Sequence, residues 1–231
     1  TKSLVTHQDS PNKNAGADEN ASERLSQKIS FYFEKFGESW ADSFFSRQIS
    51  MGQSGILFAM KKFQPFVTRF LRKHPAYLRL GWINDVIGEN DYEGAARSLE
   101  KLATKHESDI WSHRVELSLA KLANLAVWEE SRMPDSLVVR RNVRRLEDLA
   151  EVDAVQEVIF AYVSPALHSA IDQKAEIDIA IEQFRNPAAA DRPSLHEIFS
   201  EALAKIVTRQ VLDSDELVDL LTHIYLSQAS E

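Results

Sequence analysis

Residues 80–128 read LGWINDVIGENDYEGAARSLEKLATKHESDIWSHRVELSLAKLANLAVW, and this stretch decides the fold class. It predicts three helices joined by short polar turns, because apolar residues recur at spacings of three and four. The recurring positions are Ala95, Ala96, Leu99, Leu102, Ala103, Leu119, Leu122, Leu125 and Ala126. Each such helix buries one stripe against a neighbour. The pattern is typical of chains that hold or stack on other proteins, and it contains no arrangement of residues suited to catalysis.

The rest of the chain extends this pattern to about ten helices without a convincing strand. Residues 1–22 are polar and lack an apolar period, so we expect a disordered N-terminal segment. Residues 23–90 and 91–231 are expected to be the N-terminal and C-terminal parts of one stack. The predicted fold is therefore all-α, an irregular α-solenoid-like array of antiparallel helix pairs.

Particular residues predict where helices begin, break and end. Gly37 lies inside a helical pattern and predicts a break there. Pro165 predicts a kink or an end in a later helix. Two capping-box patterns predict helix starts, the first at Ser194 with Glu197 and the second at Asp213 with Glu216.

The composition excludes several classes of protein. The 231 residues carry a formal net charge of −8, which disfavours general binding to nucleic-acid phosphates. There is no cysteine, so disulfides, thiolate catalysis and cysteine-ligated zinc are excluded, and a nuclear or cytosolic location fits. Only 7 glycines and 7 prolines occur, which disfavours a many-stranded β fold. No apolar run approaches the roughly 20 residues that cross a bilayer, so we expect no transmembrane segment.

Patterns that would indicate an enzyme are weak. His196 and Glu197 resemble the start of a zinc-protease motif, but Ser200 stands where the second histidine would be needed. His106 and His113 could approach each other across a turn, yet no carboxylate is placed to complete a metal site. We therefore predict no catalytic residue, metal or cofactor. An enzyme whose site is assembled from scattered histidines and carboxylates is the least favoured alternative.

A basic stripe offers another alternative. Arg140, Arg141, Arg144 and Arg145 lie on one side of a predicted helix, and acidic residues follow within reach of intrahelical pairing. The pattern favours a solvated helix face. The alternative that remains open is a helical adaptor that binds nucleic acid or an acidic partner through this stripe.

A partner-binding function requires an apolar stripe that stays free after neighbouring helices have packed. The helix expected over residues 110–128 is the candidate, because its apolar residues do not fit one narrow face. Val115, Leu119, Leu122 and Ala126 form one stripe, whereas Trp111, Leu117 and Trp128 lie off it.

Four segments carry a resemblance to a known family. They read FYFEKFGESWADSFF (31–45), TRFLRKHPAYLRLGWINDV (68–86), YEGAARSLEKLA (92–103) and LSLAKLANLA (117–126). In this order and spacing they resemble the C-terminal α-helical domain of the nucleoporin one-thirty-three family. The resemblance covers residues 31–128, and the rest of the chain fits only as helices.

The resemblance implies a structural scaffold component of the nuclear pore complex at the nuclear envelope. It implies tail-to-tail binding to the C-terminal domain of a helical nucleoporin of the eighty-four/one-oh-seven family, at the end of the Y-complex stem. Such a component supports pore assembly and nucleocytoplasmic transport. No small-molecule substrate and no direct nucleic-acid contact are expected.

The resemblance also suggests where the partner binds. The contact region of the family matches residues 92–128 of this chain. The candidate partner-binding residues there are Leu99, Leu102, Trp111, Glu116, Leu117 and Leu119.

Overall fold

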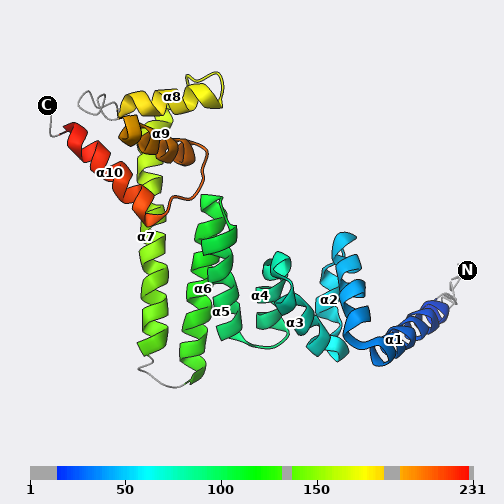
Figure 1. Cartoon of the computed structure of the whole chain (residues 1–231). Helices are drawn as coiled ribbons and strands as arrows, with labels where there is room; N and C mark the ends of the chain where they lie inside the picture. The colour runs from blue at the N-terminus through cyan, green and yellow to red at the C-terminus, as the bar shows by residue number, and fades with distance from the viewer. Residues whose placement is uncertain (1–14, 132–136, 185–192, 229–231) are drawn as a thin grey trace, which may run out of the picture. The chain divides into compact units, whose positions relative to one another are not determined.

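The computed structural model describes residues 15–131, 137–184 and 193–228, and all of its regular elements are helices. In chain order these are α1 (Ala15–Ser50), α2 (Gly55–Ala59), η1 (Lys61–Phe63), α3 (Gln64–Lys73), η2 (Pro75–Tyr77), α4 (Leu78–Ile87), α5 (Tyr92–His106), α6 (Ile110–Ser131), α7 (Leu137–Leu167), α8 (Gln173–Gln183), α9 (Pro193–Val207) and α10 (Ser214–Gln228). Figure 1 labels the α-helices along the chain. The predicted all-α stack of about ten helices is confirmed.

The chain divides into two compact units, Thr1–His74 and Pro75–Glu231. The boundary expected between residues 90 and 91 falls inside the second unit. The reason is that Trp82 and Val86 of α4 pack against Ala95, Ala96 and Ala123, which belong to α5 and α6. Trp82 and Val86 of α4 are thus partly covered by the helices that follow α4.

The first unit is built around aromatic rings. Gly37 interrupts α1 with φ 56° and ψ −135°, a conformation that a residue without a Cβ adopts readily, so the predicted break is confirmed. The Phe33 ring stacks on Phe63 with centroids 4.1 Å apart, and Phe45 contacts Phe70 at 5.3 Å. These contacts join α1 to η1 and α3.

The start of α1 differs from the expectation for residues 1–22. Residues 15–22 are helical, whereas residues 1–14 lie outside the described part of the chain. Residues 15–22 read AGADENAS, and their alanines and glutamate have adequate helix propensity. Acidic residues near a helix N-terminus are also favoured by the helix dipole. Polar composition alone therefore led to an incorrect boundary.

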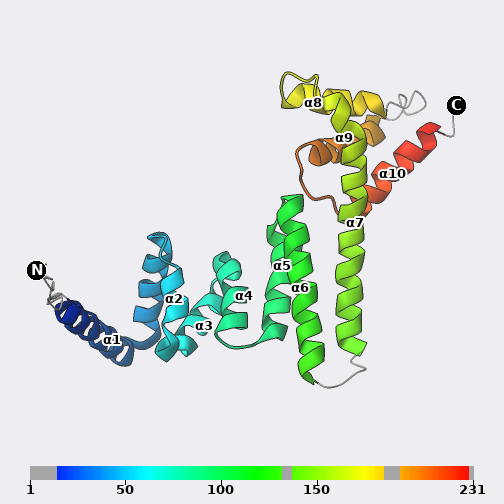
Figure 2. The same cartoon turned by 180° about the vertical axis from the view of Figure 1, so that it is seen from behind.

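In the second unit, α5, α6 and α7 lie side by side, and α8, α9 and α10 gather around the C-terminal half of α7 (Figures 1 and 2). One core cluster joins α5, α6 and α7 through Leu99, Ala103, Leu117, Ala120 and Leu146. A second cluster joins α7, α9 and α10. Its buried members are Ile159, Phe199, Ala202, Leu203, Ile206, Leu212, Leu217 and Leu220.

Helix ends agree with their sequence signals where these are described. Asp213 Oδ1 accepts from Glu216 N at 2.8 Å, and Glu216 Oε2 accepts from Asp213 N at 3.0 Å, so this capping box is confirmed. The α7 helix ends two residues after Pro165. The side chain of Ser194 lies outside the described residues. Within the described part of the chain, no helix is long and apolar enough to span a membrane.

Candidate functional site

Three of the six candidate partner-binding residues lie in the interior. Leu99, Leu102 and Leu117 are only 1%, 6% and 1% exposed. Leu99 and Leu117 belong to the core cluster between α5, α6 and α7. The helical spacing that singled them out reflects packing inside this chain. They therefore offer no surface to a partner in this conformation.

Leu119 and Glu116 are also held by neighbours within the chain. Leu119 is half-buried and packs against the same core cluster. Glu116 is buried, and its Oε1 lies 3.3 Å from Arg79 Nη2. Burial raises the pKa of the Glu116 carboxyl, and the nearby positive charge of Arg79 opposes this in part.

The raised pKa gives a test of this environment. A carboxyl that binds protons more readily in the folded chain contributes stability at low pH and loses that contribution as pH rises through its folded pKa. We expect Glu116→Gln to raise the free energy of unfolding by up to about 1 kcal/mol at pH 7. The gain should shrink as the pH falls toward 4. Urea unfolding of both proteins across this range checks it, and a less stable variant at pH 7 would show that the Arg79 ion pair outweighs burial.

Trp111 is the candidate residue that the structure leaves exposed. Its side chain is 69% exposed, and Val115 and Leu122 on the same helix are 37% and 61% exposed. Positions 111, 115 and 122 differ by four and seven, so the three side chains lie on one face of α6. We call Trp111, Val115 and Leu122 the α6 stripe. The sequence interpretation had placed Trp111 off this face and Leu119 on it; the structure reverses both.

Charged side chains border the α6 stripe on the side of α7. Lys121 Nζ lies 2.8 Å from Glu147 Oε1 of α7 and lowers the pKa of that carboxyl. Arg114 Nη1 lies 3.9 Å from Glu157 Oε1, also on α7. An exposed apolar centre with a charged edge is the usual composition of a protein interface.

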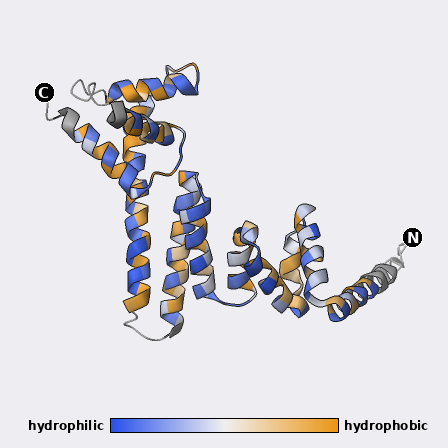
Figure 3. Ribbon diagram, viewed as in Figure 1, coloured by the Kyte–Doolittle hydropathy of each residue, from blue (hydrophilic) through white to orange (hydrophobic). Residues whose placement is uncertain are grey.

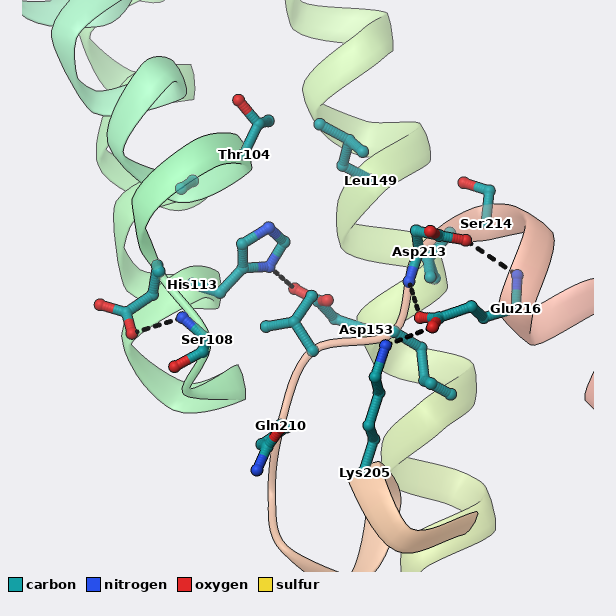
Figure 4. A pocket seen from close by; sticks show the side chains of 15 residues that line it. Thr104, Ser108, His113, Leu149, Asp153, Lys205, Gln210, Asp213, Ser214 and Glu216 are labelled. Carbon is teal, nitrogen blue, oxygen red and sulfur yellow. Dashed lines mark hydrogen bonds and ion pairs between the residues drawn. The ribbon is translucent and has the colours of Figure 1, made fainter. Parts of the chain in front are cut away.

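A buried polar pair holds the start of α6 against α7. Figure 4 shows His113 of α6 and Asp153 of α7 pointing toward each other. His113 Nδ1 and Asp153 Oδ2 are 2.8 Å apart, and both side chains are buried. The pair fixes the first turns of α6, which carry Trp111 and Val115 of the α6 stripe, against α7.

The loop from α9 to α10 (residues 208–213) also contacts this place, and we call the contacts that join α6, α7 and this loop the joint. Ile110 N donates to Arg209 O at 3.0 Å, and Val211 N donates to Ser108 O at 2.9 Å, so the loop pairs with the segment before α6. Arg209 has a positive φ of 62° and is held by Glu157 at 2.5 Å and by the ring of Phe160 at 4.3 Å. The loop is thus fastened to both α6 and α7.

Gln156 of α7 is the central side chain of the joint. It is 1% exposed, its Oε1 accepts from Leu212 N at 3.0 Å, and its Nε2 donates to Gln210 O. One buried amide therefore satisfies two backbone groups of the loop.

A cavity of about 400 Å³ lies beside the joint (Figure 4). Among its lining carboxylates, Asp153 holds His113, Asp213 caps α10 and Glu216 pairs with Lys205. Across the described residues, no group of three or more histidine, aspartate and glutamate side chains could hold a metal ion. These three carboxylates thus serve helix packing and the capping of α10.

Comparison with known proteins identifies the family. The sequence model of a family described as the non-repetitive/WGA-negative nucleoporin C-terminal matches residues 2–231. The chain belongs to this nucleoporin family. It is 32% identical over 201 residues to nucleoporin NUP133 of Chaetomium thermophilum, covering 85% of this chain and 14% of that protein. It is 24% identical over 207 residues to nucleoporin nup132 of Schizosaccharomyces pombe, covering 86% of this chain and 17% of that protein.

The matched residues span 14% and 17% of the length of these two curated relatives, so the chain corresponds to one helical part of such a nucleoporin. No solved structure matches it significantly. The predicted resemblance to the C-terminal domain of the nucleoporin one-thirty-three family is confirmed.

The basic stripe of this nucleoporin domain is partly neutralised. Arg145 pairs with Glu100 of α5, and Arg144 pairs with Asp148 at 3.0 Å along α7. Arg144 and Arg145 therefore contribute to local pairing and to packing within the chain. The structure favours the solvated helix face over a phosphate-binding surface.

Sequence reasoning missed two further exposed apolar stripes. Val155, Val158 and Tyr162 lie on the C-terminal half of α7, and Val218, Leu221 and Tyr225 lie on α10. Both sets follow spacings of three and four. The signal was present, but it could not be separated from core packing until the inward faces of α7 and α10 were known. Figure 3 shows apolar residues along both helices.

Proposed function

We propose that this chain is a non-catalytic scaffold module that binds a helical nucleoporin of the eighty-four/one-oh-seven family through the α6 stripe. Membership of the nucleoporin family places the chain in the nuclear pore complex, as a structural component. The binding of that partner, tail to tail at the end of the Y-complex stem, is our proposal. Pore assembly and nucleocytoplasmic transport are the processes that such a contact would support.

The observation that carries the proposal is the exposure of Trp111, Val115 and Leu122 on a helix whose other faces are packed. The opposite side of α6 buries Leu117, Ala120 and Ala123 against α5, α4 and α7. A single rigid helix therefore presents large apolar side chains to solvent in one line. Tryptophan is the residue type most often found to dominate the binding energy of protein interfaces.

The geometry of the partner follows from this surface. An apolar stripe on a straight helix is complemented by another amphipathic helix that packs along it. An interface of this kind needs to bury roughly 1,200–2,000 Å² in total to be stable and specific. The α6 stripe would form its centre, with Arg114 and Lys121 at its charged edge.

A test of the proposal is the removal of the Trp111 side chain. We expect Trp111→Ala to weaken binding to the C-terminal helical domain of the partner by more than about 2 kcal/mol, roughly 30-fold, because a central anchor is lost. The melting temperature should change little, since the side chain is exposed. Isothermal titration calorimetry measures the affinity.

The matched control is Tyr225→Ala on α10, where an aromatic side chain 71% exposed is removed away from the α6 stripe. It should bind the partner as the parent chain does. Equal affinity of the parent and Trp111→Ala would refute the placement of the contact on α6.

A further inference from the structure

The C-terminal half of α7 carries a long exposed face without charge. Val158 and Tyr162 are 69% and 63% exposed, and Val155 is 37% exposed. Ala154 and Ala161 are exposed on the same side. With Pro165 these residues extend over three turns, and we call them the α7 seam.

The α7 seam begins beside the residues of α7 that contact the start of α6. Asp153 and Glu157 bind His113 and Arg114, and in α7 they immediately precede Ala154 and Val158. On α6, His113 and Arg114 lie between Trp111 and Val115. The two apolar surfaces therefore start at the same level of two adjacent helices within one compact unit.

The residue types of the α7 seam fit a second α-helix. Ala154, Val158, Ala161 and Pro165 are spaced by four, three and four, so they align along one face. Small side chains seven residues apart allow another helix to approach closely, at the shallow angle of coiled-coil-like packing. No charged side chain lies on this line. A helix that covers it must therefore present an apolar stripe, because a charge buried there without a partner is costly.

One charged group lies where the two surfaces meet. Arg114 is half-exposed, and its contact with Glu157 Oε1 is long at 3.9 Å because Arg209 occupies the same oxygen at 2.5 Å. A guanidinium has five donors in a planar fork that suits a carboxylate. Arg114 thus retains donors for an acidic side chain from outside the chain.

We propose that the α7 seam is a second contact for the same helical nucleoporin. An α-helix of that partner would lie along α7 from Ala154 to Pro165, with an apolar stripe on the seam and a carboxylate at Arg114. The inference rests on the proposed function and extends the docking surface from one helix to two. The partner would then contact two helices of this chain, α6 and α7. Two separate contacts fix the orientation of the partner relative to this chain.

The experiment is hydrogen–deuterium exchange of the full chain, alone and with the C-terminal helical domain of the eighty-four/one-oh-seven nucleoporin. Protection of amides in residues 111–122 and also in 154–165 supports the α7 seam. Protection of 111–122 alone overturns it and leaves the proposed function standing. If no complex forms, or neither segment is protected, both proposals fail.

A pair of variants tests the energetic contribution. Val158→Asp places a charge on the α7 seam and should weaken partner binding at least tenfold, whereas Val218→Asp places the same charge at a 60% exposed site on α10 and should not. Both sites are exposed, so thermal melting should be nearly unchanged. Equal binding by the two variants refutes the seam. Concentration-dependent dimers of the chain alone that Val158→Asp abolishes would instead assign the seam to a second copy.

Discussion

Leu117→Glu should unfold the second unit of the chain. Leu117 is 1% exposed and lies in the core cluster with Leu99, Ala120 and Leu146. A carboxylate at this position would have no partner and would also remove packing between α5, α6 and α7. We expect a loss of at least about 4 kcal/mol in the free energy of unfolding, which is large relative to the stability of a typical domain. Circular dichroism and thermal melting measure the loss.

The matched variant is Leu122→Glu, five residues later on the same helix but 61% exposed. It should keep the helical content and melting temperature of the parent chain while losing partner binding. The two variants make the same chemical change at one interior position and at one position on the proposed docking surface. A folded Leu117→Glu protein that fails only in binding would show that the core and contact assignments are exchanged.

Gln156→Leu should destabilise the joint between α7 and the α9–α10 loop. The substitution replaces the polar amide with an apolar group of similar size and leaves Leu212 N and Gln210 O without their side-chain partner. Each unsatisfied buried polar group costs about 1–3 kcal/mol, so the two groups together give an expected loss of about 2–6 kcal/mol. Amide exchange at Leu212 should accelerate strongly. Urea unfolding and exchange measured by NMR check both expectations.

Gln183→Leu is the control for this change, because Gln183 is exposed at the end of α8. Its stability should stay within about 0.5 kcal/mol of the parent chain. If Gln156→Leu is equally mild, the buried amide does not fasten the loop and water or another group satisfies the two backbone atoms.

The fold could be predicted from sequence because local signals agreed with one another. Apolar spacing located the helices, Gly37 marked the break in α1, and the Asp213–Glu216 pair marked the start of α10. These signals act over a few residues and are therefore readable in a single chain. The start of α1 was misjudged because polarity does not distinguish a solvated helix from a disordered segment.

The sequence predicts which helices carry the contact surface, but not which of their side chains are exposed. Leu117 and Leu122 are chemically identical and five residues apart, yet one is buried by α5 and α7 and the other is exposed. That difference depends on which neighbours pack against α6, and these come from α4, α5 and α7, which are separate segments of the sequence. The joint likewise depends on contacts between distant residues: His113 and Asp153 are 40 positions apart, and Gln156 and Leu212 are 56 positions apart.

The most direct test of the central claim is size-exclusion chromatography with light scattering. The chain and Leu122→Glu would each be mixed with the C-terminal helical domain of the eighty-four/one-oh-seven nucleoporin, at low salt and at 1 M salt. Apolar contacts persist when salt screens charges. We predict a one-to-one complex of the parent chain at both salt concentrations and none with Leu122→Glu. A complex that Leu122→Glu still forms, or that dissociates in salt, would contradict docking through the α6 stripe.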